Sequence, residues 1–171
     1  PKLWFLFDLD RSGFIEKRDY DVVQARTKAG GGLFAIELGG RGDLTRTAVK
    51  WKAEKSLPNI PSPLLYRNVL YVLKEGGILT AYDPAEGRIL KQGRVEGAVD
   101  AYFASPVASD GKIITAAKDG KVAVLKAGAD WSVQQVNDLG EEIWATPAIE
   151  SGRLFVRTQN ALYCFGLPQV Q

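Results

Sequence analysis

Residues 62–72 read SPLLYRNVLYV, and the chain repeats this stretch twice. The later versions are SPVASDGKIIT at residues 105–115 and TPAIESGRLFV at residues 146–156, at steps of 43 and 41 residues. Each version contains a Ser/Thr-Pro pair, a short apolar run, a turn and a second apolar run. A period near forty residues built from short strands is typical of a β-propeller, in which each repeat forms one four-stranded sheet around a common axis. We therefore expect an all-β propeller segment.

Turn residues divide each repeat into four expected strands. The first strand begins at the Ser/Thr-Pro pair, because proline fits the start of a strand. The second strand follows the first turn. The third strands are expected at residues 78–82, 121–125 and 161–165, and the fourth near 88–94 and 131–137.

The two ends of the chain are incomplete in complementary ways. Residues 33–37 match a third strand and residues 48–52 match a fourth strand, so half of a blade precedes the first full repeat. The last repeat stops after its third strand, at Gly166. We expect about three and a half four-stranded blades, which is below the usual minimum of four.

The residues just before each Ser/Thr-Pro pair also repeat. Ile60, Phe103 and Trp144 stand two places ahead of the pair, an offset that suits packing between adjacent blades. The same loops are expected to line the central funnel, where Asn59, Asp100 and Tyr102 would be the polar contacts.

Composition excludes several classes of function. The chain has no histidine, which removes Ser-His-Asp triads and His-ligated zinc, and its single cysteine, Cys164, permits no internal disulfide. A net charge of +2 with mixed signs gives no basic face for nucleic acid. No apolar run approaches the roughly 18 residues of a membrane span, and no signal peptide opens the chain.

Residues 1–29 differ from the rest and are expected to form a separate unit, followed by the blades at residues 30–171. The segment DLDRSGFIEKRD, residues 8–19, resembles an EF-hand loop with a helix on each side, the exiting helix covering residues 20–28. Gly13 stands at position six, where the sharp turn of such a loop requires a positive φ. The expected metal ligands are Asp8, Asp10, Ser12, Phe14 through its carbonyl, Glu16 and Asp19.

The loop departs from the EF-hand pattern at its last position. Asp19 replaces the usual glutamate and is one methylene shorter, which weakens Ca²⁺ binding and makes Mg²⁺ more competitive. The chain also lacks a second loop with which to pair. The loop is therefore either a weak structural calcium site or a decayed one.

The repeats resemble those of the pyrroloquinoline-quinone-like (PQQ-like) propellers over residues 33–166. The resemblance rests on the Ser-Pro starts, the Asp-Gly turns and LTAYDPAEG at residues 79–87. Trp51 and Trp131 would match the docking tryptophans of the family on fourth strands, with Leu90 in that place in the first full repeat. The resemblance implies a C-terminal portion of a longer ring of eight or so blades, often periplasmic or secreted. Some members are quinone dehydrogenases, but the chain lacks their adjacent cysteine pair, so PQQ is not expected.

These features together lead to one functional hypothesis and one alternative. The leading hypothesis is a non-catalytic, calcium-stabilised propeller scaffold or protein-interaction module. The alternative is an enzyme, either a hydrolase or a quinone-type oxidoreductase, whose site forms only in a complete or oligomeric ring. The expected partners are the missing blades of a longer chain, or a second copy that joins around a two-fold axis into a ring of seven or eight blades.

Overall fold

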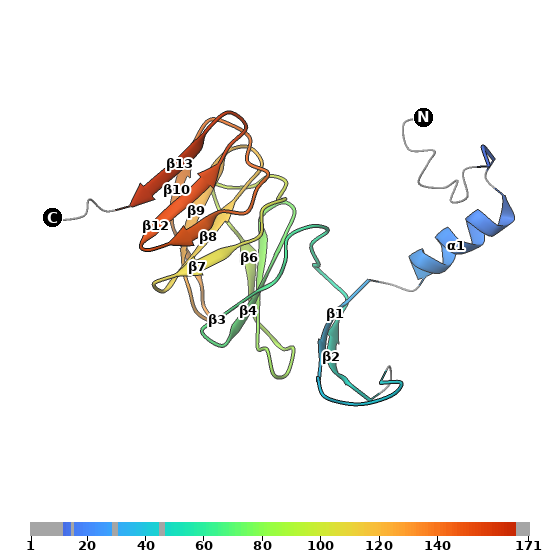
Figure 1. The fold of residues 1–171 in the computed structure, drawn as a ribbon. Helices are drawn as coiled ribbons and strands as arrows, with labels where there is room; N and C mark the ends of the chain where they lie inside the picture. The colour runs from blue at the N-terminus through green and yellow to red at the C-terminus, as the bar shows by residue number, and fades with distance from the viewer. Residues whose placement is uncertain (1–11, 15, 29–30, 45–46, 167–171) are drawn as a thin grey trace.

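The computed structural model describes residues 12–14, 16–28, 31–44 and 47–166 (Figure 1). Within these residues the chain forms one helix, α1, and thirteen strands in four antiparallel sheets. Three of the sheets stand side by side as successive blades, and the fourth is a two-stranded hairpin. The expectation of an all-β propeller segment with about three and a half blades is confirmed.

The blades have the strand order that the repeats predict. Blade 1 is β3 (Leu64–Tyr66), β4 (Val69–Lys74), β5 (Ile78–Tyr82) and β6 (Ile89–Arg94). Blade 2 is β7 (Val107–Ser109), β8 (Lys112–Ala116), β9 (Lys121–Lys126) and β10 (Ser132–Asp138). Blade 3 is β11 (Ala148–Glu150), β12 (Arg153–Arg157) and β13 (Leu162–Gly166), and its described part ends after a third strand.

The turn after each first strand is set by local backbone chemistry. Arg67 and Asn68 in blade 1 both have positive φ, at 48° and 58°. Asp110 in blade 2 and Ser151 in blade 3 also have positive φ, and a glycine follows each of them. Two consecutive residues with positive φ form the tight hairpin whose twist matches that of the flanking strands. Because this turn depends on the local residue types, the repeat can be recognised from the sequence alone.

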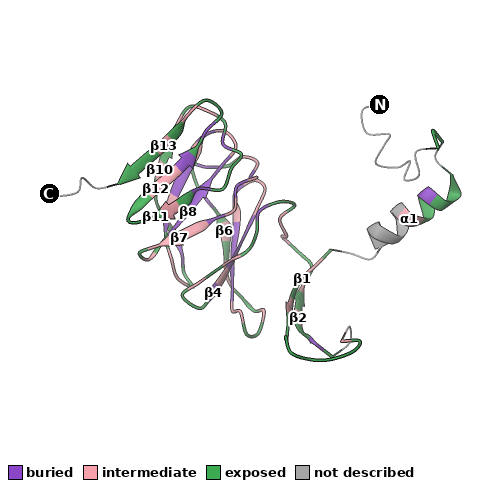
Figure 2. Ribbon diagram, in the orientation of Figure 1, coloured by how far each residue is buried: buried purple, intermediate pink, exposed green. Residues whose placement is uncertain are grey.

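The apolar core lies between the blades (Figure 2). The interface between blades 1 and 2 is the larger one and includes Tyr71, Leu79, Leu125 and Trp131. The interface between blades 2 and 3 is smaller and is built around Ile114, Ile143 and Val156. The outer strand β13 is largely exposed, as its green ribbon in Figure 2 shows.

A hairpin precedes blade 1 and is held to it by one tryptophan. Strands β1 (Leu33–Ile36) and β2 (Val49–Ala53) pair antiparallel, as expected for a third and a fourth strand. The ring of Trp51 on β2 stacks on Tyr82, with ring centroids 6.2 Å apart, and its Nε1 donates a hydrogen bond of 2.9 Å to the Pro84 carbonyl. A Cβ on Gly87 would lie 2.4 Å from the indole, so this position has no room for a side chain.

Each fourth strand carries a bulge, so the residues that occupy the place of Trp51 in blades 1 and 2 differ from those predicted. Trp51 lies opposite Ala35, and the same place in blade 1 is taken by Lys91 opposite Ala81, because Leu90 is the extra residue of the bulge. Trp131 stands just before β10 and packs backwards on blade 1. The assignment of Leu90 to the place of Trp51 is therefore wrong by one residue, since a bulge shifts the register without a signal in the sequence. The assignment of Trp131 is also wrong, because in blade 2 that place belongs to Gln135, opposite Val124.

Helix α1 (Lys17–Lys28) is the expected exiting helix, and it begins three residues earlier than predicted. Glu16 is its N-cap, and the carboxylate of Asp19, two residues into the helix from Lys17, accepts a hydrogen bond from the Glu16 backbone N–H at 3.1 Å. This contact satisfies a donor that the helix start would otherwise leave unpaired. The expected entering helix lies outside the described residues.

Candidate functional site

One feature of the described part of the predicted metal loop, the turn at Gly13, is as an EF-hand-like loop needs. Gly13 has φ of +86°, as predicted for the turn at position six. The Ser12 hydroxyl donates to the Phe14 carbonyl at 3.2 Å, so the two predicted oxygen ligands are adjacent. Ser12 and Phe14 are both exposed residues.

The last predicted ligand is held in place by the helix. Asp19 is 3% exposed, and its Oδ2 faces the Glu16 backbone N–H at the start of α1. The positive end of the helix dipole also favours a carboxylate here. Ser12, Phe14, Glu16 and Asp19 offer oxygen only, and hard cations such as Ca²⁺ and Mg²⁺ prefer oxygen ligands.

The remaining predicted ligands, Asp8 and Asp10, lie outside the described residues. Among the residues that the structure does describe, no group of three or more His, Cys, Asp or Glu side chains is arranged to hold a metal ion. Of the predicted ligand set, the described residues include the carboxylates of Glu16 and Asp19, the Ser12 hydroxyl and the Phe14 carbonyl.

A second candidate region follows the propeller axis, where the Ser/Thr-Pro pairs connect the blades. The Ser62 backbone N–H donates to the Ser105 hydroxyl at 2.9 Å, and the Ser105 N–H donates to the Thr146 hydroxyl at 3.0 Å. The hydroxyls of Ser105 and Thr146 therefore each join their blade to the one before it. The Ser/Thr-Pro pairs are visible in the sequence. The hydrogen-bond partner of each hydroxyl lies about forty residues away, so the sequence does not predict it.

An aromatic contact accompanies these hydrogen bonds. The rings of Phe103 and Trp144 lie 4.3 Å apart, which confirms the packing between blades that their shared offset predicted. Trp144 is 50% exposed at the end of the row, and the Lys118 ammonium lies 4.8 Å from its ring centroid. Its indole Nε1 donates to the Glu142 carboxylate at 2.9 Å. An exposed aromatic ring held by three neighbours is suited to contact another protein.

The three polar residues expected in the funnel, Asn59, Asp100 and Tyr102, differ from one another in burial and in hydrogen bonding. Tyr102 is 1% exposed and its hydroxyl donates to the Ala98 carbonyl at 2.6 Å, so its expected role in the funnel is wrong. Burial raises the pKa of the Tyr102 hydroxyl above its ordinary value. Asp100 accepts a hydrogen bond from the Ala101 N–H at 2.7 Å, and the Asn59 N–H donates to Glu75. These contacts shape the loops around the axis.

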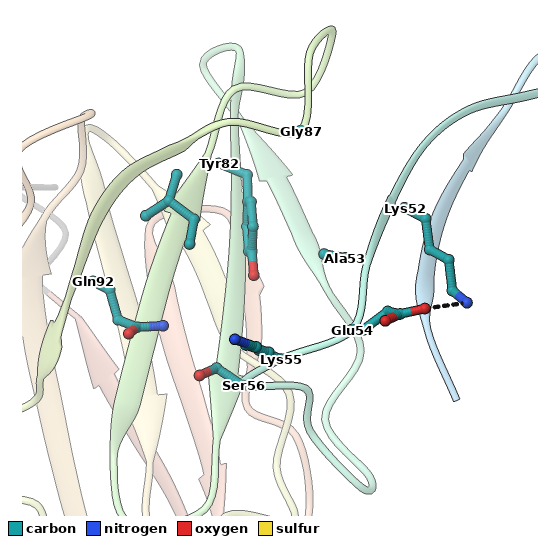
Figure 3. Close-up of a pocket in the computed structure, with 9 residues that line it drawn as sticks. Lys52, Ala53, Glu54, Lys55, Ser56, Tyr82, Gly87 and Gln92 are labelled. Carbon is teal, nitrogen blue, oxygen red and sulfur yellow. Dashed lines mark ion pairs between the residues drawn. The ribbon is translucent and has the colours of Figure 1, made fainter. Parts of the chain in front are cut away.

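The structure also has a groove that the sequence did not predict, between the end of β2 and the outer face of blade 1 (Figure 3). It is open and has a volume of ≈ 590 Å³. Its wall on the β2 side is charged, with Lys52 paired to Glu54 at 2.5 Å. Its wall on the blade side includes Tyr82 and Gln92, and Gln92 donates to the Thr80 hydroxyl at 2.9 Å.

No helix within the described residues is long and apolar enough to cross a membrane.

Known proteins resemble the chain in structure. No family model and no curated protein matches it. BamB from Moraxella catarrhalis superimposes with a TM-score of 0.58 and 19% identity, over 70% of this chain and 37% of that one. The quinohemoprotein alcohol dehydrogenase ADHIIG from Pseudomonas putida HK5 gives a TM-score of 0.52 and 16% identity, over 63% of this chain and 19% of that one.

At these identities the likeness concerns the fold, and fold alone does not imply function. The chain spans a little over a third of the length of BamB and about a fifth of that of the dehydrogenase. The two neighbours differ in kind, since the name of one gives an enzyme activity and the name of the other gives none. Function therefore has to be inferred from the surfaces and loops of this chain.

Proposed function

We propose that the protein is a non-catalytic propeller scaffold that binds other polypeptides and is stabilised by calcium. The observation that carries this proposal is the connected row along the axis. Ser62, Ser105 and Thr146 link three blades by hydrogen bonds, and Trp144 is held exposed at the end of that row. Rigid frames that present exposed aromatic side chains are the usual basis of protein recognition.

Residues 1–29 are proposed as the calcium-binding unit and residues 30–171 as the propeller unit. The ligands in this proposal are Asp8, Asp10, Ser12, the Phe14 carbonyl, Glu16 and Asp19, with Mg²⁺ as a competitor. The support is the positive φ of Gly13, the adjacent Ser12 and Phe14 oxygens and the fixed Asp19 carboxylate. A bound ion would fix the start of α1 and the segment that leads into β1.

We place the repeats with the PQQ-like propellers and regard the chain as a portion of a longer ring in the periplasm or outside the cell. The fold of the two structural neighbours and the share of their length that this chain spans support that placement. Further blades of the same polypeptide, or a second copy around a two-fold axis, are the proposed partners of the two open ends. PQQ is not part of the proposal.

The experiment for the calcium part is a calorimetric titration of the whole chain with CaCl₂. We expect saturable heat at about one ion per chain, which Asp8→Ala removes because it takes away the first ligand. Asp21→Asn is the matched control, since Asp21 lies on α1 beyond the loop, and it should leave the heat unchanged. Absence of heat at millimolar calcium would contradict the proposed site.

The non-catalytic scaffold is tested separately from the calcium site, because the enzyme alternative predicts catalytic turnover where the scaffold predicts none. A scaffold gains no turnover when its ring is completed, whereas an enzyme gains activity only in the complete ring. Hydrolase and dye-linked dehydrogenase assays on the completed ring therefore discriminate between the two. Turnover above background would refute the scaffold.

A further inference from the structure

The groove between β2 and blade 1 has a smaller counterpart between blades 1 and 2. The counterpart is lined by Gly93 and Trp131 and has a volume of ≈ 350 Å³, whereas the groove, with Ala53 and Gly87 in the same places, has a volume of ≈ 590 Å³. In the counterpart the ring of Trp131 lies 3.3 Å from the place of a Cβ on Gly93 and takes up the space. Gly87 has no side chain that could do so. The ring of Trp51 covers Gly87, but the space beside Ala53 stays open.

The face of blade 1 toward the groove is polar where the same face of blade 2 is apolar. In blade 2 this face packs in the core between blades 1 and 2. Burying polar groups costs free energy unless hydrogen bonds compensate, so the replacements indicate polar contacts at the groove. By strand register, Thr80, Tyr82 and Gln92 stand in the places of Ala123, Leu125 and Val136.

Of these polar groups, the Tyr82 hydroxyl lacks a partner. Tyr82 is 2% exposed, and its hydroxyl has no hydrogen bond to any described residue, whereas Thr80 and Gln92 bond to each other. Figure 3 shows the Tyr82 ring directed into the groove, with its hydroxyl toward Lys55 and Ser56. Burial raises the pKa of the Tyr82 hydroxyl above its ordinary value, so the group stays protonated at neutral pH and is available as a donor.

The charges that line the groove leave one positive charge for a ligand. Lys52 and Glu54 pair at 2.5 Å and neutralise each other. Lys55 stands in the place of the buried Val95 of the next loop, and it forms no ion pair within the described part of the chain. A ligand with a single negative charge would match the Lys55 ammonium and the Tyr82 hydroxyl, because hydrogen bonds to an ionised acceptor are the strong ones.

We propose that this groove binds a small aromatic carboxylate, with the planar ring beside Ala53 and the carboxylate at the Tyr82 hydroxyl and the Lys55 ammonium. The ring would lie in the space that an indole occupies in the next interface. The volume of ≈ 590 Å³ lies within the range of about 300–1,000 Å³ that is typical of small-molecule sites. The Ser56 hydroxyl and the Gln92 amide line the same groove and can bind the second carboxylate oxygen. This site adds small-molecule binding to the proposed scaffold and requires neither calcium nor a polypeptide partner.

The test is a calorimetric titration of the whole chain with indole-3-acetate, a planar ring that carries one carboxylate. We expect saturable heat with a Kd at or below about 1 mM. Tryptamine has the same ring with an ammonium group and should bind at least tenfold more weakly, because Lys55 repels it. Acetate should show no saturation at the same concentrations, because it lacks the ring that buries apolar surface.

Single substitutions locate the site. Tyr82→Phe should weaken the binding of indole-3-acetate at least tenfold, since it removes the donor and keeps the ring. Lys55→Gln, at an exposed position, should weaken it at least threefold. Lys50→Gln is the matched control, because Lys50 lies on β2, pairs with Glu37 and is not among the residues that line the groove. It should change the affinity less than twofold.

Four results would each overturn the proposal. They are no saturation with indole-3-acetate up to about 10 mM, equal affinity for tryptamine, unchanged affinity in a folded Tyr82→Phe variant, and equal losses for Lys55→Gln and Lys50→Gln. The last result would reduce the effect to net charge. Circular dichroism shows whether Tyr82→Phe is folded, and if it is not, the comparison of Lys55→Gln with Lys50→Gln decides.

Discussion

Trp131 is expected to contribute more to stability than any other tryptophan of the described blades, and Trp131→Ala tests this. The indole is 3% exposed and lies between blades 1 and 2 against Gly93. Truncating a buried tryptophan of this kind costs about 3–5 kcal/mol, from lost burial and from the cavity left behind. Domains of this size are stable by about 5–15 kcal/mol, so the variant should lose a large part of its free energy of unfolding.

Urea unfolding followed by far-ultraviolet circular dichroism measures this loss, with an unchanged m-value if only stability is altered. Trp144→Ala is the matched control, because Trp144 is 50% exposed and loses mainly the Phe103 contact, worth about 0.5–1.5 kcal/mol. Trp131→Phe should recover most of the loss, since the indole Nε1 has no hydrogen-bond partner in the structure. Equal losses for Trp131→Ala and Trp144→Ala would refute the assignment of the core.

Three further predictions follow from single contacts. Gly87→Ala should release the hairpin from blade 1, because a Cβ there would lie 2.4 Å from Trp51 and φ is +69°; proteolysis should then become faster between β2 and β3. Ser105→Ala should cost about 0.5–1.5 kcal/mol in urea unfolding by removing the acceptor of the Ser62 N–H, whereas Ser105→Thr should restore it. Burial raises the pKa of Tyr102 in the folded state, so its contribution to stability is present below the unfolded value near 10 and is lost as pH rises above it. Tyr102→Phe should therefore flatten the fall of the urea midpoint between about pH 9 and pH 11, and an unchanged slope would contradict this origin.

The strands could be predicted because their signals are local. Asp110 and Ser151 stand before glycines at tight turns, and the alternating runs that follow have the period of a strand. The exiting helix was predicted three residues too short, because the contact from Asp19 to the Glu16 N–H that begins the helix is a matter of side-chain geometry.

Features that depend on distant residues could not be predicted. The hydroxyl of Ser105 serves the N–H of Ser62, 43 residues earlier, and no local pattern reveals this. Tyr102 was expected in the funnel from its loop, but its side chain turns into the core. The bulge at Leu90 moved Lys91 into the place opposite Ala81, and a bulge leaves no periodic signal.

Half of the candidate calcium site can be compared with the structure. The positive φ of Gly13 is as the loop pattern requires at position six, and it could be predicted because a twelve-residue loop fixes the place of its turn. The ligand roles of Asp8, Asp10, Ser12, Phe14, Glu16 and Asp19 stay predictions from the sequence.

Thermal unfolding of the whole chain in CaCl₂ and in a chelator tests the calcium-stabilised scaffold most directly. A ligand that binds only the folded state at one hundred times its Kd adds about 2.7 kcal/mol to stability. We predict a higher Tm in calcium, and no shift for Asp8→Ala. Equal Tm values with calcium and with chelator, or an equal shift in the variant, would contradict the account.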